Sequence, residues 1–189
     1  MKPIRTFSLL IAFAAAASLN IFAAAAAGAI TPARVSRPVL RAIEMSLDDR
    51  LGKMWADNPL AVVGHTRAVY LEGYGAVFTV ELSLAWDGTA LMHQSLTPQE
   101  KLAVVKKKTE RVPQLKKAME EALVDSAASL DPLPSAEQVV IQVILDRYDW
   151  EDKPSYPAEL IFQATRQKLL DIKRANGAGM ELAIRVTEH

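Results

Sequence analysis

The clearest pattern along the chain is an alternation of apolar and mostly polar positions that runs from residue 76 to residue 84. Ala76, Phe78, Val80, Leu82 and Leu84 are separated by Val77, Thr79, Glu81 and Ser83, which is the two-residue period of a strand with one buried face. Residues 66–71 before it are rich in β-branched and aromatic side chains, and residues 72–75, Glu-Gly-Tyr-Gly, can form a turn. This stretch predicts a β-hairpin.

Residues 39–56 have a helical period instead. Pro38 suits a first helical turn, and apolar residues recur at intervals of three and four, namely Leu40, Ile43, Leu47, Leu51, Met54 and Trp55. The spacing predicts an amphipathic helix that ends before Asn58-Pro59. The charged residues off this stripe are expected to be solvated: Glu44, Asp48, Asp49, Arg50 and Lys53.

A second, longer helix is predicted from Thr97 toward Ser129. The sequence Thr97-Pro98-Gln99-Glu100 is a helix start in which Thr97 and Glu100 cap each other. Pro113 lies inside the periodic region, so we expect a kink or two successive helices there.

The last third of the chain contains three predicted strands and a short helix. Within residues 137–148, the run 139–145 is apolar except at Gln142, as in an interior strand covered on both faces. Residues 159–165 follow as a strand, and residues 166–175 as a short helix ended by Asn176-Gly177. Alternation at Met180, Leu182, Ile184 and Val186 predicts a final strand.

The predicted elements give an α+β fold with a largely antiparallel sheet of about five strands covered by helices. A preceding amphipathic helix is followed by a β-hairpin, a long helix, a second hairpin, a short helix and a last strand. We expect residues 1–27 to be a signal peptide, residues 28–38 a linker, and residues 39–189 a single α+β domain.

The signal-peptide assignment depends on the N-terminal segment. Lys2 and Arg5 precede an apolar run over residues 7–22, and the small residues 23–28 offer Ala-x-Ala cleavage positions. The alternative is a retained membrane anchor, since about 20 apolar residues can span a bilayer. The chain has no cysteine, so lipid attachment at cysteine, disulfides and thiolate chemistry are excluded. We expect a periplasmic or secreted bacterial protein that is not a lipoprotein.

Charge argues against a nucleic-acid partner. Removal of residues 1–27 takes away Lys2 and Arg5 but no acidic residue, so 22 acidic residues face 20 basic ones. A slightly acidic chain lacks the concentrated basic face that phosphate backbones require.

The candidate chemistry is an acidic cluster at the end of the predicted interior strand. Asp146, Asp149, Glu151 and Asp152 surround Trp150, and gathered carboxylates can hold a hard cation or act as acid and base. His93 and His65 lie on segments that flank the first hairpin and could add a nitrogen ligand. A solvated acidic turn is the competing interpretation, because the glycine-bearing calcium-loop pattern is absent and Arg147 and Lys153 lie close by.

One stretch resembles a known group of sequences. Residues 70–78, Tyr-Leu-Glu-Gly-Tyr-Gly-Ala-Val-Phe, are similar to a segment of uncharacterised exported bacterial proteins, and residues 137–143 and 148–152 fit the same pattern. The resemblance implies export and brings no assigned activity, so it assigns no functional residue.

These observations favour an exported, non-catalytic domain that binds another envelope component or assembles with itself. It would need no cofactor, and it would contact a membrane only if its N-terminal segment were retained. The alternative is a periplasmic hydrolase or metal-dependent enzyme in which carboxylates of residues 146–152 act with His65 or His93.

Overall fold

A mixed sheet carries the fold of the computed structural model, which describes residues 34–55, 60–85, 96–151 and 155–189. Its strands are β1 (Ala61–Val62), β2 (Arg67–Leu71), β3 (Gly75–Ser83), β4 (Gln138–Leu145), β5 (Glu159–Thr165) and β6 (Arg185–Glu188). The order across the sheet is β1-β3-β4-β5-β6, and β2 pairs with β3 beside β1. Six strands therefore make a sheet that is five strands wide.

Antiparallel pairing dominates, as predicted. The hairpin β2–β3 pairs Arg67 with Thr79 and Leu71 with Gly75, and β4–β5 and β5–β6 are also antiparallel. Only β3 and β4 run parallel among the described strands, because helix α3 (Pro98–Ser129) connects them and returns the chain to the starting end of the sheet. The α+β fold with a largely antiparallel sheet is confirmed.

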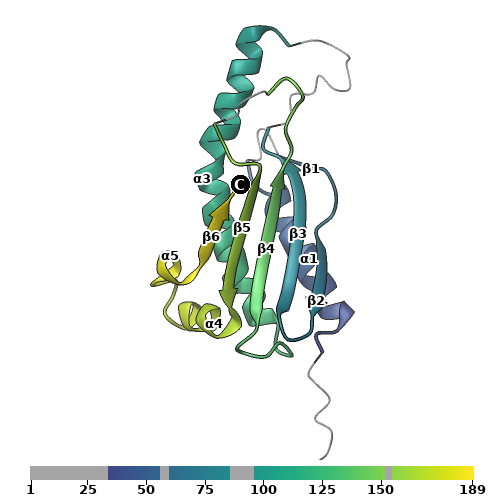
Figure 1. Ribbon diagram of the computed structural model, residues 1–189, viewed down its shortest axis with the longest axis vertical. Helices are drawn as coiled ribbons and strands as arrows, with labels where there is room; N and C mark the ends of the chain where they lie inside the picture. Colours follow the sequence, from purple (N-terminus) through teal and green to yellow (C-terminus); the bar gives the residue numbers. More distant parts are fainter. Residues whose placement is uncertain (1–33, 56–59, 86–95, 152–154) are drawn as a thin grey trace, which may run out of the picture. The chain divides into compact units, whose positions relative to one another are not determined.

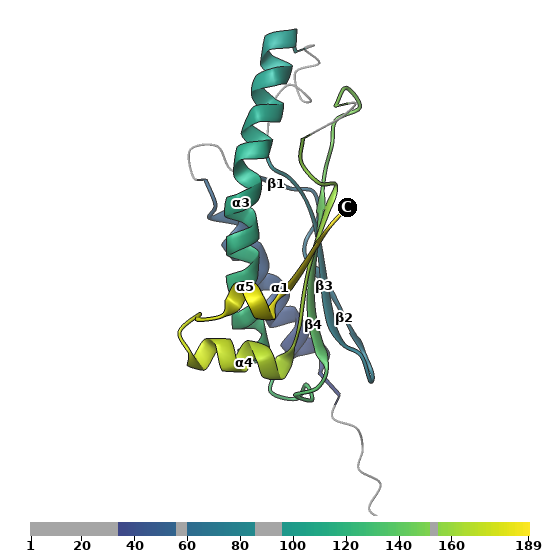
Figure 2. The same ribbon diagram turned by 60° about the vertical axis from the view of Figure 1, so that its left-hand side comes forward.

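The four described helices lie on one face of this sheet. Figure 2 shows α1 (Arg37–Gly52), α3, α4 (Arg166–Arg174) and α5 (Met180–Ala183) on the same side. The core between the layers includes Phe78, Leu115, Met119, Ile141 and Phe162, each with no exposed surface. The opposite face of the sheet is bare in the described part of the chain, and we call it the bare face.

Strand β4 was therefore predicted correctly as interior but wrongly as covered on both faces. Its residues Val139, Ile141 and Val143 are fully buried under the helices, whereas Ile144 is 37% exposed on the other side. An apolar run along a strand predicts two covering layers, but no described helix covers the second face, on which Val140 is 5% exposed and Ile144 is 37% exposed.

Helix α3 is continuous through Pro113. The expected capping box is present: Glu100 N donates to Thr97 Oγ1 at 3.3 Å and Thr97 N donates to Glu100 Oε2 at 2.7 Å. Pro113 lies inside the single helix Pro98–Ser129, so of the two alternatives expected at Pro113, a kink or two successive helices, the second is excluded. Figure 1 shows α3 running along the sheet and beyond its end.

The N-terminal part of the described chain joins the core earlier than expected. Helix α1 begins at Arg37, and Val35 before it is 7% exposed. The prediction that Glu44 is solvated is wrong, because Glu44 is only 2% exposed. Its carboxylate contacts the backbone of β2, a pairing that helical periodicity cannot show.

The last predicted strand is shorter than its alternating pattern. Residues 180–183 form the one-turn helix α5, and β6 begins only at Arg185. Strand β5 pairs Gln163 with Arg185 and ends at Thr165, where α4 begins. Residues before 183 would therefore find no strand partner, and Leu182 is 95% exposed.

Candidate functional site

The acidic turn after β4 does not present its carboxylates together. Glu151 is 8% exposed, whereas Asp149 is exposed and Asp146 is half-buried. Asp152 and His93, the remaining candidates, lie outside the described residues. Within the described ranges, no group of three or more potential metal ligands is found.

Glu151 is held by a lysine from the long helix. Lys108 Nζ lies 2.6 Å from Glu151 Oε1, and neither side chain has exposed surface. Lys108 also donates to the carbonyl of Asp146 at 3.2 Å. Tyr148 N donates to Glu151 Oε1 at 3.3 Å, and the Tyr156 hydroxyl donates to Oε2. This pair is compensated on both sides, as a buried ion pair requires.

Aromatic rings complete the surroundings of Lys108. Its ammonium lies 4.2 Å from the centre of the Tyr148 ring, and Tyr148 stacks on Trp150 with centroids 5.3 Å apart. Lys101 Nζ lies 5.4 Å from the centre of the Trp150 ring. Lys101 and Lys108 are two helical turns apart and so lie on one side of α3. The rings of the turn are thus bracketed by two cations, which fixes the turn against the helix.

The electrostatics of this cluster favour a structural role. Burial, followed by the hydrogen bond to Glu151, raises the pKa of Tyr156, so its hydroxyl keeps its proton. Lys108 and Glu151 both direct their polar atoms at protein groups. A general base must reach a proton on its substrate, and the described geometry directs these groups at each other.

His65 is paired with a different carboxylate. Its Nδ1 lies 3.1 Å from Asp48 Oδ2 of α1. Asp48 Oδ1 accepts hydrogen bonds from Thr66 N at 2.9 Å and from Thr66 Oγ1 at 2.6 Å. The sequence missed this contact because Asp48 and Thr66 lie on different elements.

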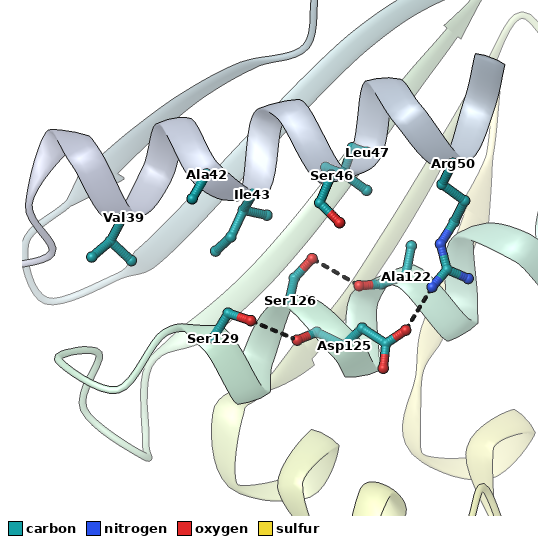
Figure 3. A pocket seen from close by; sticks show the side chains of 10 residues that line it. All are labelled: Val39, Ala42, Ile43, Ser46, Leu47, Arg50, Ala122, Asp125, Ser126 and Ser129. Atoms are coloured by element: carbon teal, nitrogen blue, oxygen red, sulfur yellow. Dashed lines mark hydrogen bonds and ion pairs between the residues drawn. The ribbon is translucent and has the colours of Figure 1, made fainter. Parts of the chain in front are cut away.

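A groove lies between α1 and α3 (Figure 3). It has a volume of about 220 Å³ and apolar walls from Val39, Ile43 and Leu47. Figure 3 shows Ser126 and Ser129 turned to carbonyls of their own helix and Arg50 pointing to Asp125. Arg50 Nη2 lies 2.6 Å from Asp125 Oδ2. The hydroxyls of Ser126 and Ser129 and the charge of Arg50 are thus already engaged within the protein.

The bare face is the larger feature. Alternation and register place on it the following residues: Val63, Arg67, Val69, Leu71, Val77, Thr79, Glu81, Val140, Gln142, Ile144, Glu159, Ile161, Gln163, Arg185 and Thr187. Tyr74 from the β2–β3 turn also lies there, since its hydroxyl is 3.5 Å from Gln163 Nε2. A polar ladder crosses the middle: Thr79 Oγ1 donates to Gln142 at 2.9 Å, and Gln142 Nε2 donates to Glu159.

Comparison of the chain with protein-family models, curated protein sequences and solved structures found no significant match in any of the three. The resemblance to exported bacterial proteins therefore stays a prediction. In the part of the chain that the structure describes, no helix is both long enough and apolar enough to cross a membrane.

Proposed function

We propose that this protein is an exported, non-catalytic domain that assembles with a second copy of itself through the bare face. The observation that carries the proposal is where the large hydrophobic side chains are exposed. Of the eight large hydrophobic side chains that are exposed in the described part of the chain, five lie on this face: Val63 (57%), Val69 (49%), Leu71 (46%), Tyr74 (43%) and Ile144 (37%).

An antiparallel sheet with a solvated outer face normally shows polar residues on that face. Here the cross-strand row Val69–Val77–Val140 is entirely aliphatic. The exposed hydrophobic residues form two groups on this face, Val69 with Leu71 and Tyr74 on one side of the polar ladder and Val63 with Ile144 on the other, and Val140 on β4 is only 5% exposed. Single exposed hydrophobic residues are ordinary, but several on one surface mark an interaction site. This favours a partner surface over a solvated one.

Charge and size favour a second copy as the partner. The face carries two cations, Arg67 and Arg185, and two anions, Glu81 and Glu159, so it presents no net charge to its own copy. The sheet is five strands wide, which is ~24 Å at a strand spacing of ~4.8 Å. Strands of about six residues at ~3.3 Å per residue are ~20 Å long, so the face of each copy has an area of about 500 Å². Two such faces together reach the ~1,000 Å² that a specific interface needs, and another sheet has the matching twist.

Export is supported by the N-terminal pattern alone: Lys2 and Arg5, the apolar run of residues 7–22, and the small residues 23–28. A non-catalytic role is supported by the engagement of Glu151 with Lys108 and Tyr156.

The test is the mass of the purified full chain in solution, measured by sedimentation at several concentrations. We expect a dimer for the wild type and a monomer for Ile144→Glu, because the substitution places a charge in the interface. Met45→Glu is the matched control, since Met45 is 61% exposed but lies on α1, and it should remain dimeric.

Two results would overturn self-association. One is a wild-type chain that is monomeric at every concentration. The other is a photo-crosslinker at Tyr74 that, in the native cell, joins a different envelope protein and never a second copy.

A further inference from the structure

The outer edge of β2 is covered by side chains of α1. Thr66 N, at the start of this edge, donates to Asp48 Oδ1 at 2.9 Å, and Ala68 N donates to Glu44 Oε1 at 2.7 Å. The carbonyl of Ala68 accepts from Arg37 Nη1 at 3.0 Å. In the described chain, β2 pairs only with β3, so these are groups that an additional strand would otherwise bind.

The spacing of these contacts follows from the geometry of the two elements. Glu44 and Asp48 are four residues apart on a helix, which is about 6 Å along its axis. Thr66 and Ala68 are two residues apart on an extended edge, which is about 6.6 Å. The two carboxylates therefore match two successive outward N–H groups. They take the place of carbonyls of a neighbouring strand, and Arg37 takes the place of its N–H.

The burial of Glu44 shows that the contact is specific. Glu44 is 2% exposed, and a carboxylate is costly to bury unless it is paired and hydrogen-bonded. Arg37 Nη2 lies 2.8 Å from its Oε1 and Arg41 Nη1 3.8 Å from its Oε2. Helix α1 is already anchored in the core by four apolar residues, Leu40, Ile43, Leu47 and Leu51. The buried carboxylate of Glu44 is therefore not needed to attach the helix to the sheet.

We propose that Glu44 and Asp48 form an edge guard that prevents β2 from pairing with β2 of a second copy. Residues Arg67–Leu71 include Val69 and Tyr70 and no proline, so this edge has the composition of a good template for strand addition. Two such edges would pair antiparallel around a two-fold axis. This surface is separate from the bare face, and the proposal does not depend on the proposed function.

The test removes the guard in a background that cannot dimerise through the bare face. We would compare the full chain carrying Ile144→Glu with the same chain carrying Glu44→Ala and Asp48→Ala as well. Asp49→Ala with Lys53→Ala in the same background is the matched control, since both residues are exposed and pair with each other and not with Glu44 or Asp48. The readouts are sedimentation and hydrogen exchange at the amides of Thr66 and Ala68.

With the guard removed, we expect exchange at both amides to accelerate at least tenfold in dilute solution. At high concentration the chain should associate, and the Ala68 amide should slow again as it enters a new strand pair. The control should remain a monomer with slow exchange.

The proposal is overturned if the guardless chain stays monomeric, or if it associates while Ala68 continues to exchange rapidly. It is also overturned if both amides remain protected in dilute solution. If the double-alanine chain does not fold, Asp48→Ala alone is measured, and unchanged exchange at Thr66 contradicts the guard.

Discussion

Two buried carboxylates, Glu44 and Glu151, are held in this protein by opposite strategies. Glu44 pairs with Arg37, whose side chain is 57% exposed, and it also accepts a backbone N–H. Glu151 pairs with Lys108, and neither side chain has exposed surface. The comparison teaches that the cost of losing a buried anion depends on where its cation can go. Arg37 can turn to water, whereas Lys108 cannot.

The largest expected effect is therefore that of Glu151→Gln. It leaves the Lys108 ammonium buried without a counter-charge, which should reduce the free energy of unfolding by about 3–5 kcal/mol. Urea unfolding measures this change. Asp149→Asn on the same turn is the control and should change stability by less than about 0.5 kcal/mol, because Asp149 is exposed.

The same site allows a sharper test of the physical cause. Lys108→Met combined with Glu151→Leu removes both charges, and replacing a whole buried pair by apolar residues is often neutral. The double variant should be more stable than Glu151→Gln alone. If it is less stable, the pair itself holds the turn on α3, and the uncompensated charge is not the dominant cost.

Glu44→Gln is the matched change at the other site. The amide oxygen still accepts from Ala68 N, and Arg37 is free to become solvated. We expect a loss of about 1 kcal/mol, in the range for a single hydrogen-bonded partner. Urea unfolding measures the loss for both variants. If Glu44→Gln and Glu151→Gln reduce the free energy of unfolding equally, the solvent access of the partner cation does not determine the cost.

These two sites also mark what the sequence can and cannot predict. Periodicity within one segment located α1, the β2–β3 hairpin and the Thr97 capping box, because those signals lie within a few residues of one another. Glu44 and Ala68 are 24 positions apart, and Lys108 and Glu151 are 43 apart. A carboxylate off the apolar stripe of a helix looks solvated until the strand beside that helix is known.

A local sequence pattern can also predict the wrong structure when the neighbouring elements do not provide the partners that the pattern requires. Met180 and Leu182 alternate like strand residues, but β5 ends at Thr165 and offers them no partner. The apolar run of β4 predicts two covered faces, although the described helices cover only one. Both errors concern neighbours in space, about which a single sequence contains no direct information.

At alkaline pH the Glu151 site should weaken and the Glu44 site should not. The pKa of Tyr156 is raised in the folded protein, mainly by burial and then by Glu151. Above about pH 10 the unfolded chain releases this proton and the folded chain retains it, so stability falls by at most about 1.4 kcal/mol per pH unit. Tyr156→Phe removes this contribution. Urea unfolding between neutral and alkaline pH should show a shallower decline for the variant, and parallel curves would contradict the assignment.

The smallest effect is expected at acid pH, on the side of the molecule where Glu44 lies. Burial raises the pKa of Asp48, but hydrogen bonds from Thr66 and the contact with His65 outweigh it and leave the pKa below its usual value. A lowered folded-state pKa contributes stability above the unfolded pKa of about 3.9, and this stability is lost as the pH falls further.

Asp48→Asn should therefore cost less than about 1 kcal/mol at neutral pH, because solvent screens part of the interaction. The difference from the wild type should shrink as the pH falls below about 4. Asp49→Asn, which removes an exposed contact with Lys53, is the control for general charge effects. A difference that stays constant from neutral to acid pH would mean that Asp48 acts through its shape and not its charge. In that case the two carboxylates of the edge guard would stabilise the protein in different ways, Glu44 through its charge and Asp48 through its hydrogen-bonding shape.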